Sequence, residues 1–374
     1  MSNKFQIFSI FFSVGCLSFG GPVAHIGYFQ TLFVQRLKWL DDEEFNRLNA
    51  LCTLLPGPSS SQLGFAIGFH RGGIWGALQA FLGFTLPSFV LMTVAGIGLL
   101  EFTKSSITWL SIIAALKIFA VIVVADACAA MQSNLCTTRQ SQWIFIATTA
   151  LLLLGISPSI VILGAGALGL LTTPKGLYPT VNMRTRINWI SATAFIGLLI
   201  ASSFYNDTLW GGFFIVGSTV FGGGHVVLPL ITQHVSQSIN SDTMLAGYAL
   251  AQALPGPMFT FASYLGAISS TATPILGACI ATVAIFLPGF LLVMTFNRHW
   301  QTLHYHPLVQ AVMGGLHPAM VALLASTLLA YIIPSSIFSY FDIALAAIAA
   351  LVFWWAPRGL LLAALFLIVT KTLL

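Results

Sequence analysis

Charged residues are scarce in this chain of 374 residues. Asp, Glu, Lys and Arg together make up 6% of the sequence and hydrophobic residues 57%, whereas a soluble domain carries about 25% charged residues. This deficit excludes a soluble globular protein. Several apolar runs, such as 74–100 and 107–131, exceed the roughly 20 residues that a membrane-spanning helix needs. The sequence therefore predicts an all-α polytopic membrane protein.

Acidic residues and paired cysteines are also few. Nine carboxylates against fourteen basic residues leave a net charge of +5, which we interpret as basic loops on the cytoplasmic side and not as a nucleic-acid-binding surface. The five cysteines are scattered without a Cys-x-x-Cys spacing, which argues against a disulfide framework. His299, His304 and His306 share one loop without a carboxylate or cysteine beside them, so we predict no metal site and no cofactor.

Patterns of catalytic residues are missing from the sequence. It contains no nucleotide-binding glycine motif, no Ser/His/Asp arrangement and no pair of intramembrane carboxylates suited to hydrolysis, so we predict that the protein is not an enzyme. A membrane enzyme that modifies lipid or isoprenoid substrates is the alternative from another functional class.

What the chain does contain is an internal repeat. Shifted by about 200 residues against itself, the sequence keeps its motifs in register along its whole length. The matching pairs are Phe19-Gly20-Gly21 with Phe221-Gly222-Gly223, Pro56-Gly57-Pro58 with Pro255-Gly256-Pro257, and Leu86-Pro87 with Leu287-Pro288. We predict an N-terminal repeat in 1–171, a basic linker with one transmembrane helix in 172–206, and a C-terminal repeat in 207–374.

The predicted helices of each repeat give an even number of membrane crossings. They comprise two interrupted apolar segments, a long helix with an internal proline, a fourth long helix and two shorter apolar segments. The single linker helix, 189–204, would then invert the second repeat relative to the first. Inverted repeats with broken helices recur among secondary transporters.

The basic residues indicate how the interrupted segments enter the membrane. If these segments crossed it, the Lys and Arg residues outside the long helices would divide eight to five between the two sides; if they dip in and return, the division becomes eleven to two. The second arrangement obeys the positive-inside rule better. We therefore predict re-entrant helices, joined in two inverted repeats.

The Pro-Gly-Pro interruptions are candidate binding sites. Proline lacks a backbone donor and clashes with the preceding turn, but it fits the first position of a new helix. The first turn of such a half-helix presents N–H groups without intrahelical partners, which favours an anion. Serine hydroxyls after the first break add donors or simply cap the helix. The candidates are Pro56, Gly57, Pro58, Ser59, Ser60, Pro255, Gly256 and Pro257.

The other two interruptions are glycine-rich, which lets the backbone approach a ligand closely. Each is followed by a histidine, although the two spacings differ by two residues. Packing kinks are the alternative explanation, but repetition at matching positions favours a function. The candidates here are Gly20, Gly21, His25, Gly222, Gly223 and His225.

One lysine lies inside an apolar helix. Lys117 is ten residues into the segment that starts at Ile107, where a lysine costs about 2.5–3.5 kcal/mol, so it should face the protein interior or water. Its match in the second repeat is His317, and we expect both cations near the substrate. Asp126 lies on the opposite face of the same helix at about 100° per residue. It is the candidate coupling residue, with a structural acid near the membrane edge as the alternative.

Together these motifs resemble the chromate ion transporter family in its long, two-domain form, over essentially the whole chain. The segments that carry the resemblance are Ser18-Phe19-Gly20-Gly21-Pro22 with His25, Leu55-Pro56-Gly57-Pro58, Phe221-Gly222-Gly223-Gly224 with Leu228-Pro229-Leu230, and Leu254-Pro255-Gly256-Pro257. The resemblance implies a protein of the bacterial inner membrane that exports chromate, a tetrahedral dianion similar to sulfate, and so gives chromate resistance.

The residue pattern agrees with an anionic substrate, because half-helix N-termini, hydroxyls and lone cations occur without a carboxylate cage for a cation. Expelling two negative charges from an inside-negative cell is favoured by about 4.6 kcal/mol per 100 mV, so membrane potential or a proton gradient would drive alternating access. Sulfate or another oxyanion as the native substrate, a passive oxyanion channel and a homodimeric assembly are left open.

Overall fold

All regular secondary structure that the computed structural model describes is helical. The described residues are 6–19, 21–102, 107–172, 187–221, 224–234, 239–296, 306–356 and 359–373. Within them, four helical stretches are long and apolar enough to cross a membrane: Ser59–Leu99, Leu110–Leu135, Pro274–Phe296 and Pro307–Ser336. Shorter apolar helices accompany them. These features agree with the predicted all-α polytopic membrane protein.

The helices follow the predicted order along the chain. The first half contains α1 (Gln6–Leu17), α2 (Gly21–Phe29) continued by the π-helix η1 (Gln30–Arg36), α3 (Asp42–Leu54), α4 (Ser59–Phe102), α5 (Ile107–Leu135), α6 (Arg139–Leu153) and α7 (Pro158–Thr172). The helix α8 (Trp189–Phe204) has the bounds predicted for the linker helix.

The second half contains corresponding α-helices in the same order, with short 3₁₀ helices at its breaks and a π-helix after α15. They are α9 (Leu209–Thr219), the short 3₁₀ helix η2 (Gly224–Val226), α10 (Val227–His234), α11 (Ser241–Ala253), η4 (Met258–Thr260), α12 (Phe261–Ser269), α13 (Pro274–Phe296), α15 (Pro307–Thr327), the π-helix η5 (Leu328–Ile332), α16 (Ile333–Ser336), α17 (Tyr340–Trp355) and α18 (Gly359–Leu373).

The interrupted segments fold back on themselves. The ring centroids of Phe11 in α1 and Phe33 in η1 are 4.9 Å apart, whereas an uninterrupted helix would separate them by about 33 Å at 1.5 Å per residue. Glu44 at the start of α3 likewise lies 3.0 Å from His70, near the end of the first part of α4. In the second half, Tyr264 of α12 donates a hydrogen bond of 3.0 Å to the carbonyl of Thr243, at the start of α11. These segments are therefore helical hairpins.

A glycine turn divides α4 into a half-helix and a long helix. Gly73 has φ +61°, a conformation that other residues rarely adopt. The two parts then lie so close that a Cβ on Gly68 would be 2.5 Å from the carbonyl oxygen of Gly76. Gly266 of α12 faces Gly277 of α13 in the same way.

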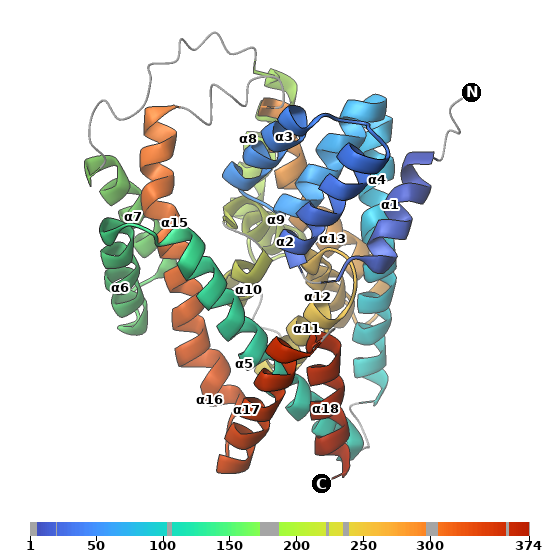
Figure 1. Ribbon diagram of the computed structural model, residues 1–374, viewed down its shortest axis with the longest axis vertical. Coiled ribbons are helices and arrows are strands. Elements are labelled where there is room, and N and C mark those ends of the chain that lie inside the picture. Colours follow the sequence, from blue (N-terminus) through green and yellow to red (C-terminus); the bar gives the residue numbers. More distant parts are fainter. Residues whose placement is uncertain are drawn as a thin grey trace.

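The helices form two groups, which we name by their content. The hairpin domain (the described residues of 6–102 and 209–296) contains the four interrupted segments and the two proline-kinked helices. The arm domain (the described residues of 107–172 and 306–373) contains α5 to α7 and α15 to α18, and the linker helix α8 packs on α9 and α13 of the hairpin domain. Within the arm domain the halves of the chain exchange partners: α6 and α7 pack on α15, while α17 and α18 pack on α5. In Figure 1, α5 rises from the bottom towards the upper left, whereas α15 descends from the top.

Candidate functional site

The four breaks of the hairpin domain meet in pairs that join the two halves of the chain. The N–H of Gly57 donates a hydrogen bond of 2.8 Å to the carbonyl of Val220, which ends α9. The N–H of Gly256 donates one of 2.9 Å to the carbonyl of Ser18, which follows α1. Each Pro-Gly-Pro break is thus bonded beside the glycine-rich break of the other half. The two bonds are equivalent in the repeat, because both their donors, Gly57 and Gly256, and their acceptors, Ser18 and Val220, are about 200 residues apart in sequence.

The proline-kinked helices close around these junctions. A Cβ on Gly57 would lie 3.1 Å from the Cα of Gly289, and a Cβ on Gly256 would lie 2.6 Å from the hydroxyl of Ser88. Gly289 follows Pro288 of α13 and Ser88 follows Pro87 of α4. Both Gly57 and Gly256 have positive φ values, +122° and +102°, so glycine is required there by conformation as well as by space.

His25 and Ser60, two of the candidates from the sequence, lie together in the first half of the chain. His25 Nδ1 lies 3.4 Å from Ser60 Oγ, and its Nε2 lies 3.3 Å from the carbonyl oxygen of Ser18. Both side chains are buried, and the ring of Phe84 meets the imidazole edge-on at 5.3 Å. The histidine therefore ties the first glycine-rich break to the serine-rich half-helix.

His225 occupies a polar cluster in the second half. Its Nδ1 lies 3.2 Å from the hydroxyl of Tyr248 and 3.1 Å from Gln252 Nε2. Gln252 also donates to that hydroxyl at 3.1 Å and contacts the sulfur of Met258. Because the amide donates to Nδ1, the imidazole proton lies on Nε2. That nitrogen is 4.0 Å from where a Cβ on Gly21 would be, so it faces the break of the other half.

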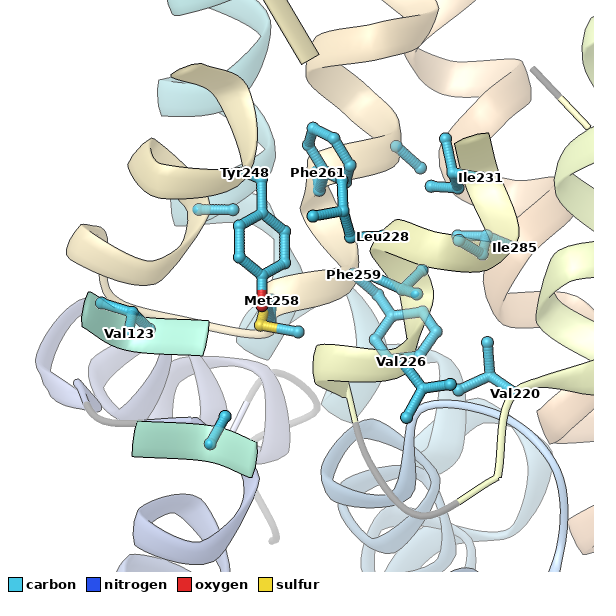
Figure 2. Close-up of a cluster of buried hydrophobic side chains, with 14 of the residues drawn as sticks. Val123, Val220, Val226, Leu228, Ile231, Tyr248, Met258, Phe259, Phe261 and Ile285 are labelled. Carbon is cyan, nitrogen blue, oxygen red and sulfur yellow. The ribbon is translucent and has the colours of Figure 1, made fainter. Parts of the chain in front are cut away.

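Apolar side chains surround this polar cluster. Figure 2 shows Tyr248 pointing towards Met258, with Phe259 and Val226 beside them. Tyr248, Met258, Phe259 and Val226 are all buried. Such packing holds the hydroxyl and imidazole in place and excludes water from their hydrogen bonds, which strengthens them.

The start of α4 presents several polar groups. The first hydrogen bond of this helix runs from the N–H of Gln62 to the carbonyl of Pro58, 2.8 Å. The N–H groups of Ser59, Ser60 and Ser61 come before this bond and so have no partner within the helix. Gln62 Nε2 donates to the carbonyls of Pro56 and Gly289, at 3.0 and 3.2 Å. Ser61 Oγ and Gln62 Oε1 are buried and have no hydrogen-bond partner in the part of the chain that the structure describes.

Lys117 lies away from the breaks. Its Nζ forms an ion pair of 2.6 Å with Asp242 at the start of α11 and lies 5.0 Å above the ring of Phe338. Asp242 is at the start of α11, and Pro255 follows the other end of this helix, about 16 Å away along the helix axis. The structure therefore connects Lys117 to the interface between the arm and hairpin domains and not to His25 or His225.

The remaining predicted residues are also in the arm domain or outside the described chain. His317 lies on α15, and its Nε2 is buried without a hydrogen-bond partner among the described residues. Asp126 of α5 accepts a hydrogen bond of 2.8 Å from the indole of Trp354 of α17. Gly20, Gly222 and Gly223 lie outside the described residues, as do His299 and His304.

The sequence reasoning did not single out Ser88, Tyr248 or Gln252. A usable signal was present for Gln252, because it is an amide inside an apolar half-helix three residues before a Pro-Gly-Pro break. Among the described residues, no group of three or more His, Cys, Asp or Glu side chains is arranged to hold a metal ion.

Comparison with known proteins gives one family for the chain. The family model described as chromate transporter matches residues 5–170 and again residues 208–370. A probable chromate transport protein of Synechococcus elongatus is 27% identical over 332 residues, 86% of this chain and 82% of the relative. The chromate transport protein of Pseudomonas aeruginosa is 26% identical over 341 residues, 86% and 79% of the two chains.

An uncharacterized transporter of Methanocaldococcus jannaschii is 26% identical over 340 residues, 87% of this chain and 83% of the relative. No solved structure matches the chain.

Proposed function

Because the chain belongs to the chromate transporter family, we propose that it exports chromate across the bacterial inner membrane by alternating access. In this proposal the two halves of the chain are inverted repeats whose hairpins enter the membrane and return. The substrate site lies where their breaks meet. Sulfate and related tetrahedral oxyanions are the competing substrates.

The observation that carries the proposal is the reciprocal pair of hydrogen bonds at the breaks. Gly57 bonds to Val220 and Gly256 bonds to Ser18, as a pseudo-two-fold relation between the halves requires. The opposite directions of α5 and α15 support inversion of the second half (Figure 1). Transporters of this build place their substrate at discontinuous helices between the repeats.

The groups at the breaks suit an oxyanion that accepts hydrogen bonds. Donors available there are the N–H groups of Ser59, Ser60 and Ser61, the buried hydroxyl of Ser61 and the Nε2–H of His225. A helix N-terminus adds partial positive charge. The N–H groups of Gly57 and Gly256 already donate hydrogen bonds between the two halves. They therefore shape the site, and the serines supply the contacts to the substrate.

Movement between the hairpin and arm domains would give the two access states. Their contacts are concentrated where α11 packs on α5 and where η2 and α10 touch α15. A rigid rotation of one domain against the other changes these contacts and leaves the break junctions, which lie within the hairpin domain, intact. The site then opens to one side of the membrane at a time.

Inverted membrane vesicles test this function. We expect chromate uptake when an inside-positive potential is imposed, since outward export becomes uptake in that orientation; a pH gradient imposed separately measures proton coupling. A competing excess of sulfate shows which oxyanion is preferred. Preloaded substrate should accelerate entry by exchange if the protein is a carrier. Vesicles that take up no chromate above the level of vesicles without the protein would contradict the proposal.

A further inference from the structure

The interface between the arm and hairpin domains is asymmetric although the helices that form it are repeated. The helix α5 of the arm domain packs along α11 of the hairpin domain, but the corresponding helices α15 and α3 do not pack to a comparable extent. Other contacts between the two halves of the chain are present in both repeats, since α7 packs on α15 and, correspondingly, α18 packs on α5. The α5–α11 contact is therefore the largest difference between the two halves at this interface.

An ion pair joins α5 and α11 at this interface. Lys117 Nζ of α5 lies 2.6 Å from Asp242 Oδ1 of α11. The lysine side chain is 6% exposed and the aspartate side chain 49% exposed. A buried ammonium needs its counter-charge, so α5 and α11 are held together as long as the two residues pair.

The equivalent residues of the other copy follow from the helix register. The helices α3 and α11 both have 13 residues, and an Asx side chain caps each: Asp41 accepts from the N–H of Glu44 at 2.7 Å, and Asn240 from the N–H of Asp242 at 3.0 Å. Asp242 is the second residue of α11, and Glu43 is the second residue of α3. On the arm domain, Lys117 corresponds to His317 at a shift of 200 residues.

Neither equivalent has a polar partner among the described residues. Of the four carboxylates at the start of α3, Asp41 caps the helix, Asp42 accepts from Gln30 at 3.3 Å, and Glu44 pairs with His70. Glu43 is exposed and forms no hydrogen bond or ion pair with the described residues. His317 Nε2 is buried and equally without a partner among them.

We propose that Lys117 with Asp242 and His317 with Glu43 are two alternating gates, of which this structure shows the first closed. When α3 docks on α15, Glu43 pairs with His317, and the Lys117–Asp242 pair opens as α11 leaves α5. This rests on the proposed alternating access and assigns the residues that stabilise each of its two states. Neither pair touches the substrate.

Cross-linking tests the second gate in the full-length protein. The five cysteines Cys16, Cys52, Cys128, Cys136 and Cys279 are first replaced by alanine or serine. Glu43→Cys and His317→Cys are then combined and treated with a short bifunctional maleimide in proteoliposomes. We expect cross-linking of this pair, and about a tenfold faster reaction when Asp242→Asn opens the first gate. Asp207→Asn, at an exposed position outside the interface, is the matched control and should leave the rate unchanged.

Charge reversal provides the second measurement. We expect Lys117→Asp to accelerate the cross-linking as Asp242→Asn does, and the combination of Lys117→Asp with Asp242→Lys to restore the original rate. The proposal is overturned if the two single cysteines react with a monofunctional maleimide but the pair never cross-links. It is also overturned if Asp242→Asn leaves the cross-linking rate unchanged. If the cross-linking rate depends on Asp242 but the protein transports no chromate, the gate proposal stands and the proposed substrate is wrong.

Discussion

Phe65 of α4 and Phe290 of α13 stack face to face, with ring centroids 4.4 Å apart and an interplanar angle of 8°. One belongs to the half-helix that starts at the first Pro-Gly-Pro break, and the other follows the kink at Pro288 by two residues. The stack, together with the contact of Gly57 on Gly289, fixes the start of α4 against the other half of the chain. These two contacts therefore make a substrate site at the start of α4 rigid.

Removing the stack should destabilise the protein. Phe65 is 2% exposed, so Phe65→Ala leaves a cavity between α4 and α13 and is expected to cost about 3 kcal/mol. Phe12→Ala, at a position that is 38% exposed on α1, should cost much less. Thermal unfolding of both variants in detergent, followed by size-exclusion chromatography, measures the difference. Equal midpoints for the two variants would mean that the stack does not support the fold.

The Gly256 junction should not tolerate a side chain. In Gly256→Ala the new Cβ meets the hydroxyl of Ser88 at 2.6 Å, and φ of +102° is strained for alanine, at a cost of about 1–3 kcal/mol. Adding Ser88→Gly relieves the clash but not the backbone strain, so we expect partial recovery of chromate transport. Gly314→Ala, in the middle of α15 with nothing within 4 Å of the new Cβ, should be neutral or stabilising. Full activity of Gly256→Ala alone would contradict the junction.

Ser61 should contribute to substrate affinity. Its hydroxyl is buried and finds no partner in the described ranges, so a bound oxyanion would satisfy it. We expect Ser61→Ala to raise the KM for chromate about tenfold with little change in folding, the equivalent of one hydrogen bond to a charged group. Ser13→Ala, which removes an exposed hydroxyl bonded to the carbonyl of Ser9, is the control. An unchanged KM in proteoliposomes would exclude Ser61 from the site.

The two partners of His225 should differ in importance. Gln252→Leu removes the amide that bonds to the imidazole and to Tyr248, which frees the ring to turn away from Gly21. Tyr248→Phe keeps the ring packing and leaves the glutamine contact in place. We therefore expect Gln252→Leu to lower the maximal transport rate about tenfold and Tyr248→Phe to lower it far less. Transport kinetics of the two purified variants check the order, and the reverse order would contradict the assigned tautomer.

Breaking the Lys117–Asp242 pair should have unequal effects on stability from its two sides. Asp242→Asn leaves the buried ammonium without a counter-charge, at a cost of about 3 kcal/mol. Lys117→Met leaves a carboxylate that is half exposed and can be solvated, so it should cost less. Combining both changes should be more stable than Asp242→Asn alone. Unfolding midpoints of the three variants test this, and additive losses would mean that the two residues do not interact.

Much of the helix layout could be predicted from the sequence. Prolines and glycines have strict backbone requirements, so the breaks at Pro56 and Pro255 and the bounds of the linker helix Trp189–Phe204 agree with prediction. The π-helical turns at Gln30–Arg36 and Leu328–Ile332 were not predicted, because no residue type marks the insertion of one extra residue into a turn.

Tertiary partners could not be predicted in the same way. The cost of burying Lys117 indicates that it needs a partner, but nothing in the local sequence identifies Asp242, which is 125 residues away. The ion pair that Lys117 forms across the domain interface could not be predicted for that reason. The helix α7 carries no charge that distinguishes α5 from α15 as the surface to pack on, and Arg139, at the start of α6, is exposed. Their exchange between the halves is visible only in three dimensions.

The exchange of α6 and α7 against α17 and α18 has a consequence for how the protein assembles. The last two helices of the first half, α6 and α7, are synthesised well before α15, the helix on which they pack. They therefore enter the membrane before their packing partner exists. A polypeptide containing just one half would complete these contacts by associating with a polypeptide that contains the other half. Co-expression of the two halves as separate chains is thus expected to yield a stable heterodimer, whereas either half produced alone is degraded.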